Sequence, residues 1–266
     1  MAIYIRPYGK SKSAFKLAVA LGIQRIMKVR NRSIDISEDE YTRYREDADQ
    51  FNDLIINWGN STPHYVFDEC NTFNPPEAVA VAINKKKTFQ VLSNNGVPTL
   101  TWTTDRDTAC SWAMLGNKVF CRTLTNSRMG KGILVCDVPE QIPVAKLYTK
   151  GEAIKREYRV HVVFGDVIDL TAKCLRKGGE RSDIQSWGNG YIFARNSVKI
   201  PDKTREALHA LALRTLEVLD LDFGAVDILR NTEDELKVLE VNTAPGIEGT
   251  TLARYVEAFR TMTSTY

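Results

Sequence analysis

Apolar residues recur along the chain with two spacings, and each spacing predicts a different element. Residues 2–7 and 54–58 are short apolar runs, which are typical of strands. Between them, apolar residues at every third position over residues 15–21 predict an amphipathic helix that ends at Gly22. Residues 35–53 are strongly charged, so we expect a solvated helix or loop there. The beginning of the chain is therefore predicted to be a small α/β unit.

The same mixture of elements continues after a break at Asn74-Pro75-Pro76, where we place a domain boundary. Helices are predicted over residues 84–95 and 202–219 and from about residue 251 onward. Strands are predicted over residues 119–121, 133–136, 145–148, 158–164, 167–173, 224–229 and 237–241. Residues 178–190 are polar and contain four glycines, so we expect a mobile loop.

Composition adds limits to this picture. The 266 residues are 43% hydrophobic and 26% charged, which is typical of a globular protein with one large domain or two to three small ones. The net charge of +3 is too small to indicate nucleic acid or a membrane surface as partner. No apolar run approaches the roughly 18 residues that span a bilayer, and the N-terminus is too polar for a secretory signal. Five widely spaced cysteines without a CxxC motif predict free thiols in a reducing, cytoplasmic environment.

The strongest chemical signal is DFGAVDILRNTEDELKVLEVNTAPGIEG, from Asp222 to Gly249. Asp227 lies inside one apolar strand, and Glu240 and Asn242 lie two residues apart in the next, so a paired hairpin can present all three on one face. Carboxylates inside a sheet are costly unless they are neutralised, and two acids with an amide oxygen suit magnesium. A solvent-facing strand is the alternative reading, but the Thr-Ala-Pro-Gly that follows argues against it.

A second stretch, CRTLTNSRMGKGILV over residues 121–135, joins two predicted strands through a loop. Its glycines, Gly130 and Gly132, would let backbone N–H groups approach phosphate oxygens, and Arg122 and Lys131 could supply positive charge. An ordinary hairpin turn is the more common meaning of such a pattern.

Alternating polar residues mark a third candidate binding site. Glu157 and Arg159 share one face of a predicted strand, and Lys173 can join them from across the hairpin. A carboxylate suits a ribose hydroxyl, whereas the cations suit phosphate or an anionic intermediate. The alternative is a cross-strand salt bridge on an exposed sheet. His161 is expected to be a packed or edge histidine and not a catalytic one. Lysines at 85–87 disfavour a helix N-terminus, which hints at a nearby anion.

In order and spacing, these motifs resemble the ATP-grasp carboxylate–amine ligases, particularly the RimK-like branch that includes a ribosomal-protein glutamate ligase. The resemblance covers about residue 80 to the C-terminus and is strongest in VDIL and LEVNTAPGIEG. The EYRVHV sequence at residues 157–162 is similar to small phage-encoded ATP-grasp proteins.

The resemblance implies an ATP-grasp fold of the α/β (α+β) class. Two α+β subdomains, residues 77–145 and 146–266, would clasp ATP. A short N-terminal α/β domain, residues 1–76, would precede them.

The resemblance also implies roles for individual residues. The implied ligands of magnesium, or alternatively manganese, are Asp227, Glu240 and Asn242. The implied nucleotide contacts are Lys85, Arg122, Gly130, Lys131, Gly132, Leu147, Tyr148, Thr149, Glu157 and Asn196. The implied stabilisers of developing charge are Arg159, Lys173 and Arg195. Two positions depart from the family pattern, because Arg122 stands where a lysine is usual and the hinge at residues 147–149 lacks the usual Glu or Gln.

The activity implied is ATP-dependent joining of a carboxylate to an amine through an acylphosphate, with release of ADP and phosphate. Small molecules, amino acids, and peptide or protein termini are the expected substrates, and a modified nucleobase stays open. Two other functions are also open. The protein could be an ATP-dependent phosphotransferase, or a non-catalytic scaffold that binds nucleotides or nucleic acid.

Overall fold

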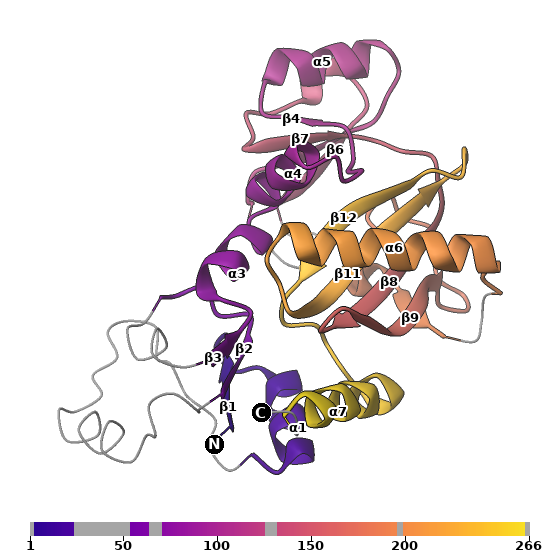
Figure 1. Cartoon of the computed structure of the whole chain (residues 1–266). Helices are drawn as coiled ribbons and strands as arrows, with labels where there is room; N and C mark the ends of the chain where they lie inside the picture. Colours follow the sequence, from indigo (N-terminus) through magenta and orange to yellow (C-terminus); the bar gives the residue numbers. More distant parts are fainter. Residues whose placement is uncertain (1–2, 24–53, 64–70, 126–131, 196–198, 264–266) are drawn as a thin grey trace.

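The computed structural model describes residues 3–23, 54–63, 71–125, 132–195 and 199–263. Its described strands form three sheets, of three, five and four strands. Figure 1 shows the four-stranded sheet at one end of the molecule, the five-stranded sheet in the middle and the N-terminal unit at the other end.

The N-terminal unit is a parallel sheet of strand order β1-β2-β3, packed with one helix. Its elements are β1 (Ile3–Pro7), α1 (Lys12–Leu21), β2 (Leu54–Trp58) and β3 (Asn71–Phe73). Ser11 caps the start of α1 by accepting a hydrogen bond from the N–H of Ala14, and Gly22 ends it at φ 74°. The predicted small α/β unit is therefore present, and the predicted segment at residues 35–53 lies outside the described residues.

The four-stranded sheet has the order β4-β7-β5-β6. Its strands are β4 (Trp102–Thr103), β5 (Val119–Arg122), β6 (Ile133–Cys136) and β7 (Leu147–Lys150), and α5 (Arg106–Met114) packs beside them. Helices α3 (Pro76–Ala82) and α4 (Lys85–Asn94) come earlier in the chain, and their residues Val79 and Leu92 belong to the apolar cluster of the five-stranded sheet. We predicted a strand over residues 145–148, but β7 begins and ends two residues later. Ala145 does not join the ladder and instead donates its N–H to the hydroxyl of Tyr148. The pattern also missed α5, which Asp105 caps and which buries Ala109 and Ala113.

The five-stranded sheet, of order β10-β9-β8-β11-β12, is antiparallel throughout. Its strands are β8 (Ile154–Val163), β9 (Asp166–Leu175), β10 (Tyr191–Ala194), β11 (Phe223–Asn231) and β12 (Leu236–Asn242). The long helix α6 (Asp202–Val218) lies across this sheet (Figure 1), and α7 (Gly249–Thr263) follows β12. Strands β8 and β9 are longer than predicted, because Ile154, Arg156 and Glu157 also pair with β11 and Cys174 and Leu175 also pair with β10.

The two faces of the five-stranded sheet differ in chemistry. Val160 of β8, Val226 and Ile228 of β11, and Val238 of β12 pack against Leu208, Ala212 and Leu216 of α6 in the largest apolar cluster. Strand residues alternate between faces, so the residues between these apolar ones face the opposite side. That side carries the polar residues described below.

Asn74 fixes the N-terminal unit to the five-stranded sheet. Its side-chain oxygen accepts the backbone N–H groups of Asp222 and Phe223 at 2.9 and 3.1 Å, and its amide donates to the carbonyl of Phe223 at 2.9 Å. Asn74 is fully buried and has φ 60°, a left-handed conformation that asparagine tolerates. Gly59 sits nearby at φ 79°, where an added Cβ would lie 2.6 Å from the Cβ of Ala244.

Cys110, Cys121, Cys136 and Cys174 are free thiols, as predicted for the cysteines that the structure describes. Among the same described residues, no helix has the length and apolar character needed to cross a membrane.

We expect Asn74→Ala to lower the free energy of unfolding by at least about 2 kcal/mol. The change leaves buried backbone groups of Asp222 and Phe223 without partners and puts a poorly suited residue at positive φ. Urea denaturation measures the loss. The matched control is Asn94→Ala, at an exposed position of α4, which should change the value by less than about 0.5 kcal/mol. Equal effects of the two variants would contradict this role of Asn74.

Candidate functional site

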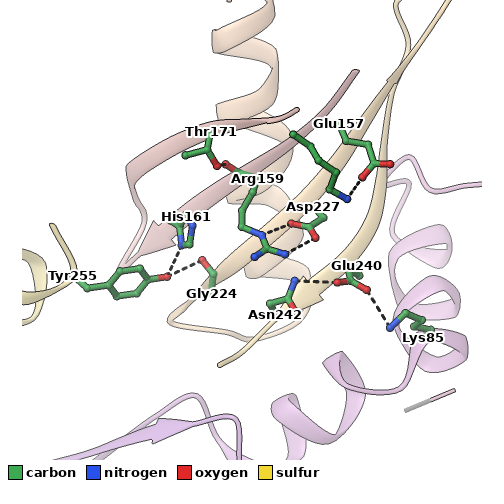
Figure 2. A network of polar contacts seen from close by, with 11 residues as sticks. Lys85, Glu157, Arg159, His161, Thr171, Gly224, Asp227, Glu240, Asn242 and Tyr255 are labelled. Carbon is green, nitrogen blue, oxygen red and sulfur yellow. Dashed lines mark hydrogen bonds and ion pairs between the residues drawn. The ribbon is translucent and has the colours of Figure 1, made fainter. Parts of the chain in front are cut away.

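Asp227 of β11 lies at the centre of the polar face of the five-stranded sheet. Its neighbours in the ladder are Arg159 on β8 and Glu240 on β12. Ile228, the next residue of β11, pairs with Val238, so Leu239 is the extra residue of a β-bulge. The bulge turns both Val238 and Val241 to the apolar face while Glu240 and Asn242 share the polar face. The structure thus brings together the three predicted metal ligands (Figure 2).

Asp227 and Arg159 form a two-pronged ion pair. The Nε and Nη2 atoms of Arg159 donate to the two carboxylate oxygens of Asp227 at 2.6 and 2.7 Å. The Asp227 side chain is 6% exposed and that of Arg159 is 18% exposed, so little water screens the pair. Burial lowers the pKa of Arg159, but Asp227 outweighs burial and raises it. Arg159 is therefore a permanent cation on this face.

Glu240 is held by a lysine from outside the sheet. The Nζ of Lys85 lies 3.1 Å from one carboxylate oxygen, and the side-chain amide of Asn242 donates to the other at 3.2 Å. Burial alone would raise the pKa of Glu240, but Lys85 and Arg159 lower it to about 2. Lys85 is the first residue of α4, so the anion that its position hinted at is Glu240. Figure 2 shows this contact, in which a helix outside the sheet reaches the polar face that carries Glu240.

The donor set of this face suits a hard cation. It offers two carboxylates and an amide oxygen, and each carboxylate can accept more hydrogen bonds or metal contacts than its present partners use. Among the described residues, no group of three or more His, Cys, Asp or Glu side chains is placed to hold a metal. Zinc-type coordination is thus not supported there, whereas magnesium takes few protein ligands and completes its shell with water and phosphate.

Glu157 and Lys173 form a second buried ion pair next to the first. Their side chains are 7% and 11% exposed, and the lysine donates to the glutamate. Burial raises the pKa of Glu157, and Lys173 only partly opposes it. The ring of Phe193 on β10 covers both cations, with Arg159 at 4.1 Å and Lys173 at 5.4 Å from its centre. The predicted set of Glu157, Arg159 and Lys173 is therefore together on one face.

The β5–β6 hairpin brings Arg122 toward the same region. Burial lowers the pKa of Arg122, partly offset by Glu240, and its Nε atom is buried without a hydrogen-bond partner among the described residues. Gly132, at φ 72°, closes the hairpin loop by accepting the N–H of Thr123 at 2.9 Å. Gly130 and Lys131 lie outside the described residues.

The residues predicted for the nucleotide hinge, Leu147, Tyr148 and Thr149, lie in β7 between β4 and β5. All three are buried, and the hydroxyl of Tyr148 donates to the carbonyl of Pro143 at 2.9 Å. The chain runs from β7 almost directly into β8, so this strand connects the four-stranded sheet to the face that carries Glu157.

Arg195 lies beyond the other predicted residues, at the end of β10. Its Nε donates to the buried carboxylate of Asp169 at 3.0 Å, and its Nη2 donates to Thr251 at 2.8 Å. Sequence reasoning missed Asp169 and Arg254, which also donates to Asp169. The alternation of Asp169, Thr171 and Lys173 along one strand was a usable signal for Asp169. Asn196 lies outside the described residues.

His161 is a packed residue, as expected. Its Nδ1 lies 3.1 Å from the hydroxyl of Tyr255, and the ring is 3% exposed. Burial, together with Arg159, lowers the pKa of His161 to about 3, so the imidazole is neutral near pH 7. It is not placed to shuttle protons with solvent.

The chain is similar to known proteins of one family. The family described as the RimK-like ATP-grasp domain matches residues 82–263. A probable alpha-L-glutamate ligase of Aeromonas salmonicida (strain A449) is 26% identical over 200 residues, which are 69% of this chain and 64% of the relative. A probable alpha-L-glutamate ligase of Psychromonas ingrahamii (strain DSM 17664 / CCUG 51855 / 37) is 26% identical over 241 residues, which are 81% of this chain and 76% of the relative. The chain thus spans slightly less than two-thirds of the length of the Aeromonas relative.

Solved structures of similar shape show the fold. D-alanyl-alanine synthetase A from Vibrio cholerae superposes with a TM-score of 0.72 at 15% identity, covering 100% of this chain and 98% of that one. The ATP-grasp ligase PsnB complexed with a minimal precursor superposes with a TM-score of 0.68 at 14% identity, covering 98% and 99%. The predicted ATP-grasp fold, of mixed helices and sheets, is confirmed.

We expect Arg159→Met to lower the free energy of unfolding by about 3 kcal/mol. The methionine leaves the buried carboxylate of Asp227 without its cation, beside Glu157 and Glu240, and an unpaired buried charge is strongly destabilising. Chemical denaturation without metal or nucleotide measures the loss. The control is Lys155→Met, which breaks a solvent-exposed pair with Asp234 and should change stability by less than about 1 kcal/mol. A loss at Arg159 no greater than the control's would mean that Asp227 does not depend on this partner.

Proposed function

Since the chain belongs to the RimK-like ATP-grasp family, we propose that it uses ATP and magnesium to join a substrate carboxylate to an amine. One observation carries the proposal. The polar face of the five-stranded sheet sets Asp227, Glu240 and Asn242 among the cations Arg159 and Lys85. Magnesium binds to carboxylate oxygens, and the phosphates of ATP bind to nearby cations. This face offers both kinds of group side by side.

Asp227, Glu240 and Asn242 would hold the magnesium ion through oxygen atoms. When bound, magnesium would neutralise negative charge on the terminal phosphates of ATP. Glu240 is suited to this because its low pKa keeps the carboxylate ionised at neutral pH. Manganese, which accepts the same oxygen ligands, is an alternative ion.

The nucleotide would lie along the same face and reach the four-stranded sheet. Glu157 would accept a ribose hydroxyl, and the buried guanidinium of Arg122 would contact phosphate. The adenine would lie at the strand formed by Leu147, Tyr148 and Thr149. The other proposed nucleotide contacts are Lys85, Gly130, Lys131, Gly132 and Asn196.

The reaction proposed has two steps. A substrate carboxylate oxygen attacks the γ-phosphorus and the bond to ADP breaks, which gives an acylphosphate. An amine then attacks the acyl carbon, phosphate leaves and the amine loses a proton. Arg159 and Lys173, both fixed under Phe193, would stabilise the transferred phosphoryl group. Arg195 would act on the acyl side. His161 is buried and neutral and is not placed to take this proton, so we propose that the amine arrives deprotonated.

Relatives suggest the substrate class. Probable alpha-L-glutamate ligases, a D-alanyl-alanine synthetase and a ligase complexed with a precursor are all among the similar proteins. We therefore propose an amino acid, a peptide or a protein terminus as substrate, with a small molecule or a modified nucleobase as further candidates. We propose that the chain is organised as an N-terminal domain, residues 1–76, and two ATP-grasp subdomains, residues 77–145 and 146–266. We also propose a cytoplasmic location, which is inferred from the free cysteines.

The decisive variants are Asp227→Asn and Glu240→Gln. Each should reduce magnesium-dependent release of ADP at least about a hundredfold, because losing a metal carboxylate costs several kcal/mol in the transition state. In the unmutated protein, magnesium-ATP at about a hundred times its dissociation constant should add roughly 2.7 kcal/mol to stability, and both variants should lose this gain.

The control for these variants is Glu248→Gln, whose side chain is 80% exposed and lies in the loop after the metal face. It should behave like the unmutated protein. Near-normal ADP release by Asp227→Asn and Glu240→Gln would overturn the metal assignment. Product analysis separates the alternatives, since a phosphotransferase yields a phosphorylated product and no amide. A scaffold releases no ADP with any carboxylate and amine pair.

A further inference from the structure

Glu152 lies in the short linker between β7 and β8, which joins the four-stranded sheet to the five-stranded one. Its Oε1 atom accepts a hydrogen bond from the Nζ of Lys237 on β12 at 2.7 Å, and the two side chains are 14% and 19% exposed. The residues predicted for the nucleotide hinge, 147–149, include no acidic side chain. The structure thus brings an acid to this hinge from a position just beyond it.

Lys237 places this pair on the polar face of the five-stranded sheet. It is directly opposite Leu229 of β11, which in turn is directly opposite Glu157 of β8. Side chains of directly opposite residues point to the same side of a sheet, so Lys237 and Glu157 share that face at about 10 Å, two strand spacings apart. Because we propose that Glu157 binds the ribose, the pair lies in the region where the base of the same nucleotide would be.

Apolar side chains surround this region on both sheets. Leu229 belongs to a cluster with Leu147 of β7, and Leu239 of β12 packs against that cluster. Ile154, two residues after Glu152, packs against it as well. Apolar side chains suit the flat faces of a purine, whereas a few polar groups at its edge fix its orientation and provide specificity. Glu152 stands where such a polar group is needed.

The carboxylate of Glu152 keeps one oxygen for a ligand. Burial lowers the pKa of Lys237, but Glu152 and Glu235 outweigh burial and raise it, so the lysine is a cation near pH 7. Among the described residues, the second carboxylate oxygen of Glu152, Oε2, accepts no hydrogen bond. An ionised carboxylate only accepts hydrogen bonds. Lys237 therefore holds a carboxylate whose remaining oxygen can receive a donor such as an amine.

We propose that Glu152, positioned by Lys237, accepts a hydrogen bond from the exocyclic amine of adenine and thereby selects ATP over nucleotides with a 6-oxo purine. The inference rests on the proposed function and names a specificity-determining residue for its nucleotide. Adenine carries a donor at position 6, whereas guanine and hypoxanthine carry an acceptor there, which a carboxylate repels. Lys237 does not touch the base and is a positioning residue.

The pair also has a structural role, because it joins the linker to the turn between β11 and β12. The N–H of Thr232 in that turn donates to the carbonyl of Ala153 at 2.9 Å. Loss of the pair should therefore lower stability even without any contact between Glu152 and a base. The ratio of affinities for two different bases separates the two roles, since a general weakening of the site changes both affinities alike.

The test is calorimetric titration of ADP, inosine diphosphate and purine riboside diphosphate into the full chain in the presence of magnesium. At position 6 the three bases carry an amine, an oxo group and only hydrogen. We expect ADP to bind at least about tenfold more tightly than either of the others, which is the size of one hydrogen bond to a charged group. This comparison uses the unmutated chain and needs no variant.

Three variants assign the preference to Glu152. Glu152→Gln, whose amide can donate as well as accept, should reduce the preference for ADP over inosine diphosphate at least about fivefold and leave the affinity for purine riboside diphosphate unchanged. Lys237→Met should reduce the same preference about threefold, and it decides the question if Glu152→Gln does not fold. Asp234→Asn is the matched control, because it breaks exposed ion pairs with Lys155 and Arg230 at the same turn and should keep the preference.

Three results would overturn the proposal while leaving the proposed function intact. These are equal affinities of the unmutated chain for ADP and inosine diphosphate, a full preference for ADP in Glu152→Gln, and an equal loss of preference in Asp234→Asn, which would assign the effect to the turn. Failure of all three diphosphates to bind would instead contradict the proposed function, and this inference with it.

Discussion

A carboxylate inside a sheet must be neutralised, and the ion pair between Arg159 and Asp227 meets this constraint at the centre of the molecule. Both residues are on adjacent central strands of the five-stranded sheet, and one side of that sheet is filled by apolar contacts with α6. The opposite side can therefore hold acids only where cations accompany them. The same requirement recurs at Glu157 with Lys173, at Glu240 with Lys85 and at Asp169 with its two arginines.

These pairs also connect distant parts of the chain. Lys85 belongs to α4 and reaches Glu240 on β12, so a helix near the four-stranded sheet contributes to the face of the five-stranded one. Arg254 and Thr251 belong to α7 and reach Asp169 on β9. A charged ligand bound on this face would thus act on contacts that join these elements.

Much of this arrangement could be predicted from the sequence because strand alternation is strictly periodic. The positions of Asp227, Glu240 and Asn242 required only that two apolar runs form a hairpin. The bulge at Leu239 could not be predicted, since no glycine or proline marks it. Lys85 and Arg254 could not be placed either, because their partners are more than 80 residues away along the chain and a helix pattern does not tell which sheet a lysine or arginine faces. Helix α5 was missed because its buried positions are small residues, Ala109, Cys110 and Ala113, which give a weak periodic signal.

The position of α7 ties the apolar core to the polar face. Phe259 packs within the cluster of Trp58 and Phe223 that joins the N-terminal unit to the sheet, with Trp58 and Phe223 stacked at 5.3 Å. One turn earlier, Tyr255 turns its hydroxyl to His161, and Arg254 reaches Asp169. A single helix therefore buries one side in the interface with the N-terminal unit and presents the other to the polar face of the five-stranded sheet. Because Asn74 fixes the N-terminal unit to the sheet at Asp222 and Phe223, the unit holds α7, and through it Arg254, in register with Asp169. On this argument the N-terminal unit stabilises the polar face indirectly, through the helix that it supports.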